Sequence, residues 1–172
     1  PTIREVRDRV RQIAKELEAR ADPVRAVAMA RYMKTTMPFR GVPRPQLDAI
    51  VRDALAAHPI TDAADYRATV EELWALPHRE EHYAAIAIAR RQHRFVDVAH
   101  LDLYRRLVVE GAWWDFVDEV AHITCRLLLA DPATMRPTLD AWIDDDDLWL
   151  RRVALLSHLD AKERTDAAML FD

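Results

Sequence analysis

Apolar residues recur along the chain at the three- and four-residue spacing that places them on one face of a helix. The first such stripe consists of Ile3, Val6, Val10, Ile13 and Leu17. The same spacing predicts helices over Pro23–Thr35 and Pro45–His58. Later helices are expected to begin at seven positions, namely Asp62, Arg79, Ala99, Trp114, Pro132, Asp147 and Ala161. Strand-like alternation is missing and glycine occurs only twice, so the sequence predicts an all-α protein.

The predicted helices are joined by short polar or proline-bearing turns, and helix–turn–helix units recur about every 35–40 residues, close to the period of HEAT and armadillo repeats. We therefore expect a single domain over residues 1–172. Its fold would be an α-solenoid of HEAT-like antiparallel helix pairs, an α-α superhelix whose concave face forms the binding surface. The final residues, Met169–Asp172, read as the middle of a helix, which predicts a domain truncated at its C-terminal end.

The composition is that of a soluble globular protein, with 51% hydrophobic and 31% charged residues. No apolar run is long enough to span a membrane, and the first residues show no signal-peptide core. Cys125 is the only cysteine. This excludes an intrachain disulfide and a thiolate metal cage, and it fits a reducing cytoplasm.

The formal net charge of −4 argues against a polyanionic partner, but the charge is distributed unevenly. Residues 1–52 hold 12 Arg and Lys against 6 Asp and Glu, whereas the rest of the chain holds 13 against 23. Phosphates respond to the local surface within a Debye length of about 10 Å. The basic first part of the chain therefore keeps nucleic acid among the candidate partners.

The segment Trp113–Asp118 carries the clearest indication of chemistry. If it opens a helix, six residues form a core stripe: Trp113, Val117, Val120, Ala121, Thr124 and Leu128. Trp114 and Asp118 then lie one turn apart on a neighbouring face, where their side chains can act together. An indole face beside a carboxylate suits a cationic or electron-poor ligand. The structural alternative is that both tryptophans pack, while Asp115 and Asp118 are solvated or cap the helix.

Five short stretches, in this order along the chain, together indicate a protein family: Met29–Lys34, Pro38–Val42, Glu72–Glu80, Trp113–Asp118 and Leu148–Ala154. They resemble the bacterial DNA alkylation repair family, and the resemblance covers essentially the whole chain. Members of that family are alkylpurine DNA glycosylases built from HEAT-like repeats. The resemblance implies an enzyme that excises positively charged N3- and N7-alkylated purines, of the 3-methyladenine and 7-methylguanine type, from duplex DNA in base excision repair.

Carried over by position, the resemblance makes Asp118 the catalytic carboxylate and Trp114 a lesion contact, with Tyr32 as a further lesion contact. It makes Arg152 a contact to the DNA backbone, although the helical register alone permits Arg151 as well. It implies no cofactor and no metal. We expect a monomer in the bacterial cytoplasm, associated with the nucleoid, whose partner is double-stranded DNA with alkylated bases and not a membrane.

Two alternatives stand beside this interpretation. His78–His82 fits the H-x-x-E-H pattern of one class of zinc peptidases, but zinc would need a third protein ligand from a following helix. The other alternative is a non-catalytic HEAT-like scaffold that binds damaged or branched DNA, or a protein partner, through its concave face.

Several remaining features favour structural roles. Asp144–Asp147 is expected to form a turn and a helix cap, and Trp74 and Trp142 are expected to lie in the core. Cys125 has no visible activating partner, which indicates an unreactive thiol.

Overall fold

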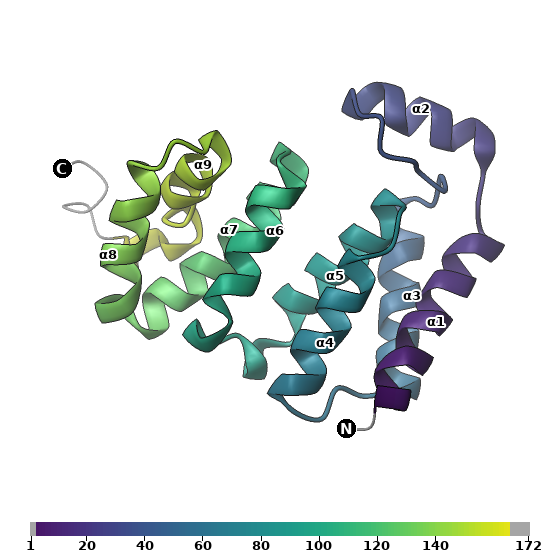
Figure 1. The fold of residues 1–172 in the computed structure, drawn as a ribbon, viewed down its shortest axis with the longest axis horizontal. Helices are drawn as coiled ribbons and strands as arrows, with labels where there is room; N and C mark the ends of the chain where they lie inside the picture. The colour runs from purple at the N-terminus through teal and green to yellow at the C-terminus, as the bar shows by residue number, and fades with distance from the viewer. Residues whose placement is uncertain (1–2, 166–172) are drawn as a thin grey trace. The chain divides into compact units, whose positions relative to one another are not determined.

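The structure, a computed structural model, describes residues 3–165, and all regular elements in that range are helical, as expected of an all-α protein. The chain forms two compact units, Pro1–Arg91 and Gln92–Asp172 (Figure 1). Consecutive helices joined by short loops pack as pairs inside the units, as α4 with α5, α6 with α7 and α8 with α9. The superhelix that such pairs would build stays a prediction.

The first unit contains α1 (Ile3–Ala19), α2 (Pro23–Met33), α3 (Arg44–Ala57), α4 (Ala63–Trp74) and α5 (Arg79–Arg91). Helix α1 packs against α3, α4 and α5. The predicted stripe on α1 is confirmed for its four described side chains, all of which are buried: Val6, Val10, Ile13 and Leu17. Trp74 is also buried, as expected. Apolar burial between α1, α3, α4 and α5 therefore holds these four helices together, whereas α2 buries only Met33.

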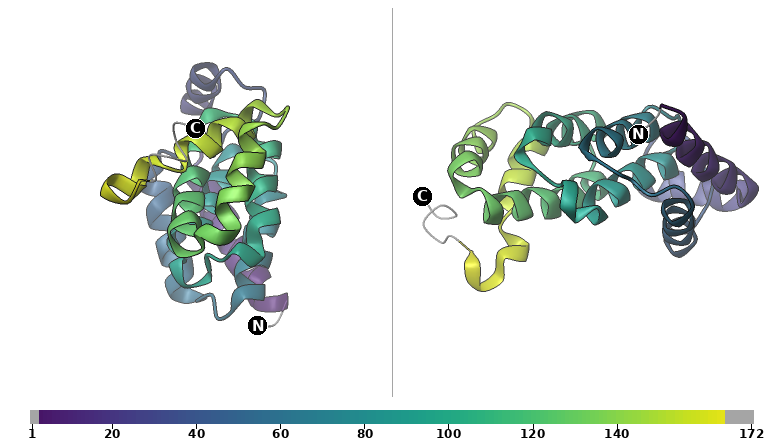
Figure 2. Two further views of the ribbon diagram at one scale, coloured as in Figure 1. Left: turned by 90° about the vertical axis from the view of Figure 1, so that its left-hand side faces the viewer. Right: turned by 90° about the horizontal axis from the view of Figure 1, so that it is seen from below.

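Helix α2 begins at Pro23, as predicted, with the Asp22 side chain accepting a hydrogen bond from the Arg25 N–H. It ends at Met33, two residues earlier than predicted, because Lys34 adopts a left-handed conformation. The Lys34 N–H then bonds back to the carbonyls of Ala30 and Arg31, which satisfies the end of the helix. The helix lies at one end of its unit, apart from the other four helices (Figure 2, left).

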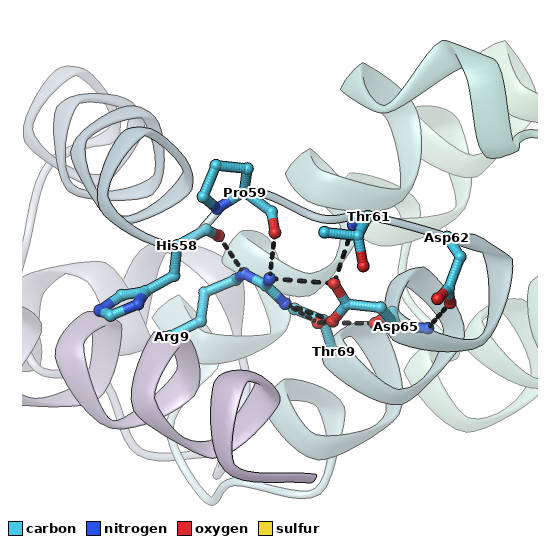
Figure 3. Close-up of polar contacts among 7 residues, drawn as sticks. All are labelled: Arg9, His58, Pro59, Thr61, Asp62, Asp65 and Thr69. Carbon is cyan, nitrogen blue, oxygen red and sulfur yellow. Dashed lines mark hydrogen bonds and ion pairs between the residues drawn. The ribbon is translucent and has the colours of Figure 1, made fainter. Parts of the chain in front are cut away.

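A fully buried arginine joins α1 to α4 and to the loop between α3 and α4 (Figure 3). The Arg9 guanidinium donates to both carboxylate oxygens of Asp65, at 2.7 and 3.1 Å, and to the Thr69 hydroxyl. Its other N–H groups donate to the backbone carbonyls of His58 and Pro59. All five guanidinium donors thus have acceptors, which is the condition under which a buried charge is tolerated.

Burial by itself would raise the pKa of Asp65, but the hydrogen bonds outweigh it. The Arg9 guanidinium, the Thr61 N–H and the Thr69 hydroxyl together hold the pKa of this carboxyl below its ordinary value. Asp65 is therefore ionised in the folded protein at neutral pH, and its charge stabilises the fold only while it remains ionised.

We expect Asp65→Asn to destabilise the first unit by about 3–5 kcal/mol, because the substitution leaves the buried Arg9 charge unpaired. Hydrogen exchange of amides in α1 and α4 measures the loss. Asp53→Asn is the matched control, since the Asp53 ion pair with Arg52 is exposed and should contribute at most about 1 kcal/mol.

The two variants should also differ in pH dependence. A depressed folded-state pKa contributes stability above the unfolded-state value of about 3.9 and loses it as the pH falls through the folded-state value. The gap between wild type and Asp65→Asn should consequently narrow in acid. A gap that does not change with pH would contradict this account.

A second buried charge holds the loop that follows α2. Glu80, which is fully buried in the first turn of α5, accepts hydrogen bonds from three consecutive backbone N–H groups, those of Arg40, Gly41 and Val42. The neighbouring carboxylate of Glu81 pairs with the Arg40 side chain at 2.8 Å. Two of the sequence stretches that carry the family resemblance, 38–42 and 72–80, therefore meet in one hydrogen-bonded cluster.

Gly41 is required at the centre of this cluster. Its φ is +87°, and a Cβ atom added there would lie 2.2 Å from the Asp22 carbonyl oxygen and 2.8 Å from the Ala26 nitrogen. Both atoms belong to the backbone at the start of α2 and cannot rotate away. The loop thus approaches α2 more closely than a side chain would allow.

We expect Gly41→Ala to lower the stability of the first unit by at least about 1–3 kcal/mol, from the left-handed conformation alone. Urea denaturation measures the change. Gly111→Ala is the control: Gly111 is the last residue of α6 and has no positive φ, so its substitution should be neutral or stabilising by up to about 1 kcal/mol.

The second unit contains α6 (Leu101–Gly111), α7 (Trp114–Ala130), α8 (Pro132–Ile143) and α9 (Leu148–Leu156), with 3-10 turns η1 (His93–Phe95), η2 (Val98–His100) and η3 (Leu159–Arg164). Helix α7 packs against α6, α8, α9 and η3. Its predicted core stripe is confirmed at five buried positions: Val117, Val120, Ala121, Thr124 and Leu128. Trp113, which precedes the helix, is only half-buried, so the prediction is too strong there.

The predicted helix start at Ala99 is displaced to Leu101, because the turn η2 comes first. The helix expected from Ala161 is wrong over its described part. Residues Leu159–Arg164 form a 3-10 helix, and the positive φ of Lys162 interrupts it. The remainder of that predicted helix, through Met169–Asp172, lies outside the described residues.

Candidate active site

Asp118 and Arg152 form a bidentate ion pair between α7 and α9. The Arg152 Nε donates to Oδ1 at 2.7 Å and the Nη2 donates to Oδ2 at 2.9 Å. Both side chains are partly open to solvent, with 37% of Asp118 and 41% of Arg152 exposed. The hydrogen bonds to Asp118 raise the pKa of Arg152, so the arginine is always charged. The pair fixes the orientation of a carboxylate that solvent and ligands can reach.

The first turns of α7 and α9 are brought together by two half-buried tryptophans. The rings of Trp113 and Trp149 lie 5.9 Å apart between centroids and are tilted by 48°. This is an ordinary geometry for packed aromatic rings. The Asp147 side chain caps α9 by accepting hydrogen bonds from the backbone of Trp149 and Leu150. This confirms the predicted cap and sets the register that points Arg152 at α7.

Trp114 is the first residue of α7 and lies one turn before Asp118. Its side chain is 43% exposed, in contrast to the half-buried Trp113. The expectation that Trp114 and Asp118 share an accessible face, separate from the core stripe, agrees with these exposures. An accessible indole one turn from an oriented carboxylate can bind a planar, electron-poor group.

The two neighbouring arginines of α9, Arg151 and Arg152, have different hydrogen-bond partners. Arg151 donates through Nη1 to the backbone carbonyls of Asp145 and Asp146, and so it closes the loop before its own helix. Arg152 binds Asp118 through Nε and Nη2, and its Nη1 has no partner among the described residues. The contact between Arg152 and Asp118 was not visible in the sequence, because the two residues are 34 positions apart.

Tyr32 belongs to the first unit, on α2, and 75% of its surface is exposed. The ring is accessible to a ligand. Tyr32 belongs to a different unit than Trp114, Asp118 and Arg152. Of the five residues named from the sequence, these last three therefore lie near one another in the second unit, and Arg151 contacts the loop before α9.

The zinc alternative finds no support among residues 3–165, where no group of three or more His, Cys, Asp or Glu side chains could hold a metal ion. The two histidines of the motif face different partners. The His82 ring packs on Trp74 with centroids 4.1 Å apart and contacts the Leu76 carbonyl, whereas His78 lies 3.6 Å from Glu81.

Trp142 and Cys125 are both buried, and burial raises the pKa of the Cys125 thiol, which opposes nucleophilic reactivity.

We expect Arg152→Ala to remain folded, with a loss of at most about 1 kcal/mol and a fall in Tm of less than about 4 °C, because the pair is solvent-accessible. Thermal denaturation followed by circular dichroism measures this. A loss as large as that of Asp65→Asn would show that the pair is a structural element and would contradict its interpretation as an accessible site.

Comparison with known proteins places these features in context. The profile of the family described as DNA alkylation repair enzyme matches residues 13–172. The solved structure of a protein named predicted DNA alkylation repair enzyme, from Enterococcus faecalis, is similar to this chain with a TM-score of 0.77 and 27% sequence identity. The similarity covers 87% of this chain and 70% of that one. No curated protein sequence gives a significant match. Within the described residues, none of the helices has both the length and the apolar character needed to cross a bilayer.

Proposed function

Because this chain belongs to the DNA alkylation repair enzyme family, we propose that it is a DNA glycosylase that excises N3- and N7-alkylated purines from duplex DNA. The observation that carries the proposal is the ion pair of Asp118 and Arg152, which holds an accessible carboxylate one turn from the exposed indole of Trp114. A carboxylate in a fully buried ion pair cannot meet a ligand, whereas an oriented and accessible carboxylate can serve a reaction.

The chemistry suits such a carboxylate. Alkylation at N7 gives the purine a formal positive charge, so the bond between C1′ of the sugar and N9 of the base breaks with the electron pair going to the base. The base departs neutral and needs no strong general acid. The sugar becomes oxocarbenium-like, as in glycoside hydrolysis. Asp118 stabilises this cation and accepts the proton of the water that adds to C1′.

Arg152 and the aromatic residues take supporting roles in this proposal. Through Nε and Nη2, Arg152 holds the Asp118 carboxylate in one orientation, and its Nη1 can donate to a DNA phosphate. Trp114 contacts the lesion, and its indole ring attracts a positively charged alkylated base more strongly than an unmodified, neutral base. Tyr32 is a second aromatic contact to the DNA, from the first unit.

A non-catalytic scaffold, for damaged or branched DNA or for a protein partner, is the second candidate, and the charge of the second unit favours a protein partner. Residues 92–172 hold 9 Arg and Lys against 16 Asp and Glu, whereas residues 1–91 hold 16 against 13. The unit that carries Asp118 is therefore the acidic one, which weakens its attraction for phosphates. The accessible carboxylate beside Trp114 is the feature that a scaffold does not require.

We expect the wild-type protein to release 7-methylguanine from methylated duplex DNA, and Asp118→Asn to lower the rate at least about 100-fold by removing the charge that stabilises the sugar cation. Asp115→Asn is the matched control, since it removes the same charge from the first turn of the same helix and should retain most of the rate. Chromatography of the released base measures both rates.

The outcomes separate the two candidates. Binding of methylated DNA by the wild type without base release would support the scaffold and exclude the glycosylase. Equal release by the wild type and Asp118→Asn would keep the enzyme but remove Asp118 from the reaction.

A further inference from the structure

The arginine and lysine side chains of the second unit that have no partner among residues 3–165 all lie near the end of α7 or in η3. Arg105, Arg106 and Arg152 pair with carboxylates, and Arg151 is bound to backbone carbonyls. Arg94 and Arg136 also have partners. Three cationic side chains in Gln92–Asp172 make no hydrogen bond or ion pair with a described residue: Arg126, Lys162 and Arg164. They lie near the end of α7 and in η3, in a unit that has an excess of acidic residues.

Two of the three line a pocket. A cavity of about 360 Å³ opens between α7 and η3 and is lined by His122, Cys125, Arg126, Leu129, Ala130, Asp160 and Arg164. Asp160 contributes one carboxylate to this pocket, and that carboxylate is hydrogen-bonded to Nδ1 of His122. Burial raises the pKa of the Cys125 thiol, so the sulfur adds no negative charge. The pocket therefore contains two guanidinium groups and one carboxylate, so one positive charge is not balanced by the residues that line it.

Two like charges that line one pocket repel each other, and an anion placed between them relieves the repulsion. Guanidinium groups match the oxygens of a phosphate with parallel N–H donors.

The position of the pocket on α7 indicates which phosphate of the DNA backbone it would bind. Steps of four residues along α7 lead from Trp114 through Asp118 and His122 to Arg126. Each step turns by about 40° around the helix, so Arg126 lies about 80° from Asp118, on the adjoining face.

The distance from the candidate active site follows from helix geometry. Eight residues separate Asp118 from Arg126, which corresponds to about 12 Å along the helix axis. At about 3.4 Å per nucleotide along one DNA strand, this distance spans roughly three or four nucleotides. Arg152 is neutralised by Asp118, so the cations of this pocket are the ones in the unit best placed to hold DNA electrostatically.

We propose that the pocket between α7 and η3 binds a backbone phosphate of the DNA, roughly three or four nucleotides from the base at Asp118, through Arg126 and Arg164. The inference rests on the proposed function in that the ligand is DNA lying along α7. It assigns the pocket a positioning role: it fixes the register of the strand relative to Asp118 and takes no part in breaking the glycosidic bond.

The first test is the salt dependence of binding to a duplex that carries a tetrahydrofuran abasic analogue, between about 50 and 200 mM salt. Loss of one phosphate contact should reduce the slope of log K against log salt by about 0.9. We expect this reduction for Arg126→Gln and for Arg164→Gln, with binding weaker by roughly ten-fold. Lys162→Gln is the matched control, because it removes the same charge from η3 outside the pocket and should leave the slope unchanged.

The second test locates the phosphate. Neutral methylphosphonate groups replace single phosphates along the strand, and binding of wild type and Arg126→Gln is compared at each position. At the contacted phosphate the wild type should lose affinity, whereas Arg126→Gln should lose nothing further, because the contact is already missing. Losses that add at every position would overturn the assignment.

Other outcomes are equally decisive. If Lys162→Gln reduces the slope as much as Arg164→Gln, the effect is general charge and the pocket is not a site. If calorimetry detects inorganic phosphate bound through Arg126 while the DNA slope is unaffected, the site takes free phosphate and the DNA inference is wrong. A wild type that excises bases with an unchanged slope for Arg126→Gln overturns the pocket but not the proposed function. A reduced slope without any base release overturns the proposed function but supports the pocket.

Discussion

The charge of Arg9 is fully excluded from water, and the first unit is arranged so that each of its five N–H groups has an acceptor. Satisfying that charge requires Asp65 on α4 and the carbonyls of the α3–α4 loop to converge on α1. The apolar faces of these helices could pack in several registers. The buried pair permits only the registers in which the guanidinium is completely bonded, because an unpaired buried charge costs several kcal/mol.

A second bidentate ion pair between an arginine and an aspartate lies in the second unit, and it is partly exposed where the first is buried. Asp118 and Arg152 share the bidentate geometry of Asp65 and Arg9, but both members remain partly open to solvent. Water weakens the contribution of such a pair to stability. What the pair provides instead is a solvent-accessible carboxylate in a fixed orientation. Exposure, and not residue identity, distinguishes the structural pair from the one on which the proposed reaction depends.

The stretches that carry the family resemblance do not all serve the reaction. Glu80 and the backbone of residues 40–42 form a buried cluster that fixes the loop after α2, with Gly41 as the residue that permits the close approach. That loop determines where α2 presents Tyr32. In the second unit, Trp113 packs on Trp149 and Asp147 caps α9. Several residues in the stretches that carry the family resemblance therefore position other residues.

The sequence by itself determined the helical class, the buried stripes of α1 and α7, the aspartate caps and the separation of Trp113 from Trp114, because these depend on neighbours within one or two turns. It could not determine which arginine of α9 meets Asp118, why Glu80 is buried, or that Arg126 and Arg164 line one pocket. Those facts join side chains from different helices, where local periodicity carries no information about distance. The helix expected from Ala161 failed for the same reason: its spacing favoured an α-helix, but the structure has a 3-10 turn that packs against α7.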